Sequence, residues 1–136
     1  MISEKEKILY MSMAKLISTQ STCKRRQVGC VIVLPTNQLL IGYNGTPPGW
    51  DNCCEDEHGF TLSHVLHAEH NAIEKATDPK ILKGSSVFVS YGPCVSCCEL
   101  LNRYNIKELF YAELPTKYVE ILHLEQCNFA SYHLPL

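Results

Sequence analysis

Residues 86–112 read SVFVSYGPCVSCCELLNRYNIKELFYA, and this stretch indicates the fold most directly. Its first residues, 86–90, predict a short strand, residues 97–104 predict a helix, and residues 108–112 predict another strand. A strand, a helix and a strand in succession imply a right-handed crossover between two parallel strands. The chain is therefore expected to be an α/β protein.

The N-terminal part predicts a helix followed by a hairpin. Ser3 and Glu6 form a capping-box pattern ahead of a helix over 4–19, in which apolar residues recur at helical spacing: Leu9, Met13, Leu16 and Ile17. Strand-like runs at 28–34 and 39–43 are separated by a proline-containing turn, which predicts antiparallel pairing. We therefore expect a mixed sheet, with an antiparallel hairpin at one side and parallel strands beyond it.

The remaining segments comprise a long loop, two further predicted helices and a C-terminal tail. Residues 44–63 form a long polar loop that is expected to border a functional site, because long loops in small domains are more often functional than idle. Residues 67–76 predict a helix, and residues 116–123 predict a final helix with Thr116 as its N-cap. The tail at 125–136 carries no clear pattern.

Composition and charge favour a compact enzyme that acts on a small molecule. The 136 residues, 46% of them hydrophobic, are expected to form a single domain over 1–136. The net charge of −2 disfavours a nucleic-acid partner. The N-terminus resembles no secretory signal, and no run is apolar enough to span a membrane. We expect a cytoplasmic protein whose eight cysteines serve metals or packing, with Cys30 a buried small hydrophobe.

Three residues have the spacing of a catalytic zinc site. His67, Cys94 and Cys97 would fill three tetrahedral positions and leave the fourth for water. Cys94 and Cys97 are three residues apart, so on the first turn of a helix their sulfur atoms share one side. Glu69, two residues after His67, would lie close enough to that water to carry its proton. A structural zinc or a redox pair of cysteines would give Glu69 no role. The pattern predicts a hydrolytic zinc enzyme.

The combination of His-x-Glu with a later Pro-Cys-x-x-Cys resembles the signature of the zinc-dependent cytidine deaminase superfamily. Three further segments, CKRRQVG at 23–29, GYNGTPPG at 42–49 and HVLHAE at 64–69, resemble the deoxycytidylate (dCMP) deaminases, and the similarity runs from about residue 18 to 111. This resemblance implies a three-layer α/β/α fold. It also implies hydrolysis of dCMP to dUMP and ammonia, which supplies dUMP for thymidylate synthesis.

Two other classes of function stay open at this point. A deaminase of another nucleoside, a free base or tRNA would share the zinc motif, although a tRNA enzyme is expected to be more basic. A zinc-stabilised binding module without activity would leave Glu69 without a role.

The resemblance also suggests which residues bind the substrate. Asn44 would contact the deoxyribose, although Asn-Gly is also a common turn dipeptide. Lys24, Arg25 and Arg26 precede the first strand, and a guanidinium suits a phosphate monoester; Arg26 is the first choice. Each of the three could equally belong to a solvated charge run. Ala68 and, by a looser match, Tyr118 complete the predicted substrate site.

Regulation is implied by the resemblance alone. Many dCMP deaminases are homohexamers that dCTP activates and dTTP inhibits, often with Mg²⁺. The corresponding nucleotide site would include Asn44, Gly45, Thr46 and Gly49. A rigid Pro-Gly turn would explain the same loop.

The other cysteines suggest a second, structural zinc. Some family members carry one, and Cys23, Cys53, Cys54 and His64, with His58 nearby, could provide its ligands. Ordinary core and surface cysteines are the alternative. Cys98 is expected to pack as a small hydrophobe beside Cys97, and Cys127 receives no role.

Overall fold

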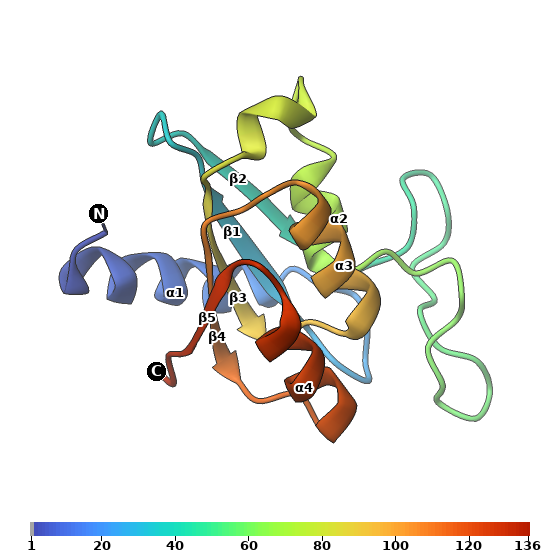
Figure 1. Cartoon of the computed structure of the whole chain (residues 1–136). Coiled ribbons are helices and arrows are strands. Elements are labelled where there is room, and N and C mark those ends of the chain that lie inside the picture. The colour runs from blue at the N-terminus through green and yellow to red at the C-terminus, as the bar shows by residue number, and fades with distance from the viewer. Residues whose placement is uncertain (1) are drawn as a thin grey trace.

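The computed structural model describes residues 2–136, which build one five-stranded sheet with helices on both faces (Figure 1). The strands are β1 (Gly29–Val33), β2 (Leu39–Tyr43), β3 (Ser86–Tyr91), β4 (Glu108–Glu113) and β5 (Ala130–His133). Their order across the sheet is β2-β1-β3-β4-β5. β1 pairs antiparallel with both β2 and β3, whereas β3, β4 and β5 are parallel. The predicted mixed sheet is confirmed.

One helix covers one face of the sheet and three cover the other. The helices are α1 (Glu4–Ser18), α2 (Ala68–Ile73), α3 (Val95–Arg103) and α4 (Tyr118–Gln126), with a short 3-10 helix, η1 (Pro79–Leu82), before β3. α1 crosses one face, and α2, α3 and α4 lie on the opposite one (Figure 1). This is the expected three-layer α/β/α arrangement.

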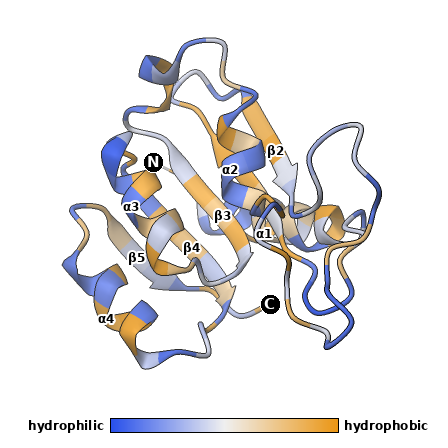
Figure 2. Ribbon diagram, turned by 90° about the vertical axis from the view of Figure 1, so that its right-hand side faces the viewer, coloured by the Kyte–Doolittle hydropathy of each residue, from blue (hydrophilic) through white to orange (hydrophobic). Residues whose placement is uncertain are grey.

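The alternation of side chains along the strands creates two separate cores. Cys30 and Ile32 of β1 point to the face that α2, α3 and α4 cover, where Ala72 and Leu101 pack against them. Val31 and Val33 point the other way and form a core with side chains of α1. β1 is buried along its whole length, so its continuous apolar run reflects burial on both faces. Figure 2 shows apolar residues along β2, β3 and β4, whereas the edge strand β5 is paler.

The C-terminal part differs from the sequence-based expectation. The predicted N-cap at Thr116 is wrong, because α4 begins at Tyr118 after Lys117, and the Thr116 amide instead donates to the Tyr91 hydroxyl. The tail, which carried no pattern, forms β5 next to β4. Its side chains are mostly exposed and mixed in polarity, so the edge strand has no alternating signal. Within residues 2–136, no helix has both the length and the apolarity to span a membrane.

Helices α2 and α3 each begin one residue after a predicted zinc ligand. His67 is the N-cap of α2, and Cys94 is the N-cap of α3. Both ends face the same end of the sheet, where β3 runs out at Tyr91 and the loop from residue 44 to residue 67 crosses. The fold thus brings two helix starts together at one place.

Candidate active site

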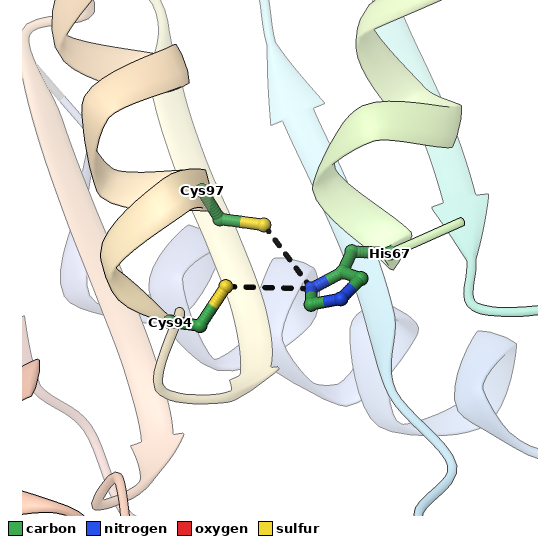
Figure 3. Close-up of side chains that lie close together, drawn as sticks. All are labelled: His67, Cys94 and Cys97. Atoms are coloured by element: carbon green, nitrogen blue, oxygen red, sulfur yellow. Dashed lines mark hydrogen bonds between the residues drawn. The ribbon is translucent and has the colours of Figure 1, made fainter. Parts of the chain in front are cut away.

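His67, Cys94 and Cys97 converge in the structure (Figure 3). The Nδ1 atom of His67 lies 3.5 Å from the Cys94 sulfur and 3.3 Å from the Cys97 sulfur. Ligands of a tetrahedral zinc, with bonds of about 2.0 to 2.3 Å, lie about 3.5 Å apart. The spacing of the three donor atoms therefore fits zinc, with Nδ1 as the ligand atom of the histidine.

The electrostatics of the cluster favour a bound cation. The hydrogen bond with Cys97 lowers the pKa of the Cys94 thiol to about 3. The pKa of the Cys97 thiol is raised, mainly by its hydrogen bond with Cys94 and to a smaller extent by burial. The hydrogen bond to Cys94 raises the pKa of His67. A divalent cation would stabilise both cysteines as thiolates, which is the form that binds zinc.

Glu69 lies on the first turn of α2 and is only 3% exposed. Burial raises the pKa of its carboxyl group, and the nearby His67 opposes that rise. The carboxyl group lines the same cavity as His67 and Cys94. A buried carboxylate beside a metal site is placed to carry protons.

A single cavity joins this cluster to the predicted substrate residues. Arg26, Asn44 and Ala68 all line it, together with His67, Cys94 and Glu69. The loop at 44–63 that was expected to border the site does so through Asn44, Glu55 and Thr61. Further lining residues that sequence reasoning missed are Tyr91 and Glu120. In the sequence, Tyr91 could have been suspected because it ends a strand two residues before Pro93 of the zinc motif. No sequence feature distinguishes Glu120 as a residue of the site.

Asn44 and Tyr91 hold the segment that carries Arg26. The side-chain oxygen of Asn44 accepts from the Val28 amide at 2.9 Å, and its side-chain nitrogen donates to the Arg26 carbonyl at 2.8 Å. The Arg26 guanidinium lies over the Tyr91 ring, 3.9 Å from the ring centroid. This cation–π contact directs the guanidinium to the cavity wall.

Tyr118 is not part of this cavity. It is the first residue of α4 and its side chain is 73% exposed, whereas Glu120, two residues later, faces the cavity. The structure therefore does not bring Tyr118 together with Arg26, Asn44 and Ala68.

Backbone hydrogen bonds hold the glycine-rich loop at 44–49 in place. Gly45 and Leu66 exchange two backbone hydrogen bonds, of 3.1 and 2.8 Å, so the Gly45 amide already has an acceptor. Gly49 has a φ of +86° in a turn closed by the bond from the Trp50 amide to the Pro47 carbonyl. This backbone conformation suits glycine and matches the Pro-Gly turn alternative.

Of the residues suggested for a second zinc, Cys23 and Cys54 come together, with Glu55 beside them, close enough to share a metal ion. The same two cysteines form a disulfide in the structure, with their Cα atoms 5.2 Å apart. The chain crossing brings these two residues to disulfide distance, which sequence spacing does not reveal. Cys53 is exposed and His64 packs against the Trp50 ring, 4.6 Å between centroids.

The other cysteines are inside the protein or at a helix end. Cys30 and Cys98 are fully buried, as expected for small hydrophobes. The Cys127 thiol donates to the His123 carbonyl at the end of α4.

Comparison with known proteins gives a consistent family. A sequence model of the cytidine and deoxycytidylate deaminase zinc-binding region matches residues 4–113. The chain is 33% identical to deoxycytidylate deaminase of Schizosaccharomyces pombe over 115 residues, covering 75% of this chain and 35% of that protein. For the Homo sapiens deoxycytidylate deaminase, the identity is 35% over 112 residues, covering 75% and 61%. The chain thus spans only part of these relatives.

The crystal structure of dCMP deaminase from the cyanophage S-TIM5, in complex with dCMP and dUMP, matches with a TM-score of 0.89 and 33% identity. The match covers 98% of this chain and 100% of the phage chain. A tRNA:A34 deaminase matches with a TM-score of 0.58 and 19% identity, which is a likeness of fold.

Proposed function

The chain belongs to the cytidine and deoxycytidylate deaminase family, and on that premise we propose that it hydrolyses dCMP to dUMP and ammonia. The observation that carries this proposal is one cavity whose wall includes Arg26 and also Glu69 and two residues of the candidate zinc cluster, His67 and Cys94. A nucleotide needs both, because the reacting amine is on the base and the charge is on the phosphate.

The three side chains His67, Cys94 and Cys97 would hold the zinc ion. When bound there, zinc would lower the pKa of water in the remaining coordination position. The oxygen of a water molecule would bond to C4 of the cytosine ring while Glu69 takes up a proton of that water and passes it to N3. Glu69 would then move the proton of the new C4 hydroxyl group to the 4-amino group, so that the C4–N bond breaks, ammonia leaves and a carbonyl forms at C4.

Arg26, Asn44 and Ala68 would bind the rest of the substrate. Arg26 pairs with the phosphate, and its contact with Tyr91 limits the orientations of the guanidinium. Asn44 keeps capacity for a further hydrogen bond to the deoxyribose, because each of its two side-chain atoms makes one bond in the structure. Ala68 has no bulk that would exclude the base. Tyr118 is left out of this set because of its exposure.

The direct test is a substrate panel with the zinc-loaded protein. Ammonia release is measured from dCMP, deoxycytidine, cytosine and tRNA, and kcat/KM is compared. We expect dCMP to be preferred. Preference for deoxycytidine, cytosine or tRNA would contradict the proposal and support the other deaminase classes.

Regulation by dCTP and dTTP with Mg²⁺, and assembly as a homohexamer, are further proposals that rest on the family resemblance. The nucleotide would bind at the loop of Asn44, Gly45, Thr46 and Gly49, although the Gly45 amide would first have to leave Leu66. Rates measured against dCMP concentration with and without dCTP test the regulation, since identical curves would refute it. Light scattering measures the assembly.

A further inference from the structure

Two consecutive backbone amides meet the carboxylate of a residue that lines the cavity. The amides of Lys24 and Arg25 donate to the same oxygen, Oε2 of Glu55, at 3.0 and 3.1 Å. The catalytic scheme gives Glu55 no role, although this residue lines the cavity together with Arg26.

This pair of amides is a binding site for an anion. Successive amides that point at one position attract negatively charged oxygen atoms, as in many phosphate sites. The next residue along the chain, Arg26, adds a cation that lines the same cavity. Among residues 2–136, no ion pair joins Glu55 to Lys24, Arg25 or Arg26. The carboxylate thus depends on the two amides for its bonds in the site.

The backbone around Glu55 is anchored, whereas its side chain is only partly buried. The disulfide joins Cys23, which precedes Lys24, to Cys54, which precedes Glu55. Glu55 is also paired with Thr61 by a backbone bridge. The side chain is only partly buried, so another anion can replace it without unfolding the loop.

We propose that Glu55 is a built-in competitor of the substrate phosphate. Its carboxylate occupies the two amides when no nucleotide is bound, and a phosphate monoester takes its place beside Arg26. The identification of that phosphate with the phosphate of dCMP rests on the proposed function. Glu55 weakens phosphate binding, because the phosphate must displace it and the two anions repel each other.

The test compares Glu55→Gln with Glu57→Gln. The amide introduced by Glu55→Gln keeps an oxygen that can accept from the two backbone amides but carries no charge, so the loop should stay folded. Glu57 lies in the same loop, its side chain is 86% exposed, and its carboxylate contacts His58 instead. The two variants therefore change the net charge equally, and only one changes the anion site.

We expect Glu55→Gln to lower KM for dCMP about fivefold, the effect of one partly exposed charge interaction, and to change the value for deoxycytidine much less. Glu57→Gln should leave KM for dCMP unchanged. Equal KM values in all three proteins, or an equal effect on dCMP and deoxycytidine, would refute the competitor role. A higher KM in Glu55→Gln would also refute it, because Glu55 would then help to bind substrate.

Binding of inorganic phosphate, measured by calorimetry without turnover, separates this inference from the proposed function. We expect Glu55→Gln to bind phosphate more tightly than the wild-type protein and Glu57→Gln to bind it equally. This order would support the anion site even if dCMP were not a substrate. Equal affinities in all three proteins, or zinc lost specifically from Glu55→Gln, would overturn it.

Discussion

At the scale of single residues, the sequence shows the spacing of the side chains in the site but not which of their atoms make the contacts. The sequence placed Glu69 two residues after His67, and the structure buries it at 3% exposure beside the cluster. The Nδ1 atom of His67, rather than Nε2, points to both cysteines. Neither the burial nor the choice of nitrogen follows from spacing, because both depend on how α2 and α3 meet.

Glu69→Gln should retain zinc and lose nearly all turnover, because the amide keeps the shape of the side chain but cannot accept and return a proton at neutral pH. Zinc content by mass spectrometry and ammonia release from dCMP measure the two effects. Cys94→Ala is the contrasting variant and should lose both zinc and activity. A zinc-loaded Glu69→Gln protein with substantial activity would remove Glu69 from the proposed role.

At the scale of elements, helix ends and close packing position the site. Gly42 of β2 lies directly under α2, where an added Cβ would stand 2.5 Å from the Ala68 carbonyl oxygen and from the Ala72 amide nitrogen. α2 begins with His67 as its N-cap, so its distance from the sheet sets the position of a metal ligand.

Gly42→Ala should destabilise the protein by about 1 to 3 kcal/mol, the usual cost of overpacking. It should also weaken zinc binding, because α2 must move away from β2. Urea unfolding and competition with a coloured zinc chelator measure the two effects. Gly45→Ala is the matched control, since nothing lies within 4 Å of its added Cβ. Equal behaviour of the two variants would contradict the packing argument.

The capping box of α1 is confirmed and gives a pH-dependent element. The Ser3 hydroxyl accepts from the Glu6 amide, and the Glu6 carboxylate accepts from the Ser3 amide, each at 3.1 Å. The bond from the Ser3 amide lowers the pKa of Glu6 below its ordinary 4.5. Because the folded pKa is the lower one, this stabilisation is present above pH 4.5 and is lost as the pH falls through the folded value.

Ser3→Ala should reduce the free energy of unfolding by about 1 kcal/mol at pH 7, since one amide of α1 loses its acceptor. Glu6→Gln should flatten the loss of stability below about pH 4.5. Thermal unfolding between about pH 3 and 7 measures both. An acid dependence as steep in Glu6→Gln as in the wild-type protein would show that Glu6 contributes nothing to it.

At the scale of the whole molecule, the cores do not depend on the metal cluster. Apolar side chains fill both faces of the sheet, with Phe88, Ile32 and Leu101 among the largest fully buried ones. The cluster lies at the starts of α2 and α3, at one end of this framework. Zinc should therefore be needed for activity rather than for folding.

Removal of zinc with a chelator should abolish dCMP hydrolysis while far-UV circular dichroism stays nearly unchanged, and added zinc should restore the rate. The unfolding transition should remain cooperative in the metal-free protein. Loss of secondary structure on chelation would instead assign the cluster a structural role.

The sequence by itself determined the mixed sheet, the start of α1 and the three residues His67, Cys94 and Cys97 that the fold brings together, because these depend on hydrophobic periodicity, capping and short motif spacing. Only the tertiary structure decided β5, the disulfide between Cys23 and Cys54, the exposure of Tyr118 and the contact of Glu55 with two amides. Each of these joins or separates segments that are distant in the chain. Local patterns carry no record of such distances, which are set when strands pair and helices pack on the sheet.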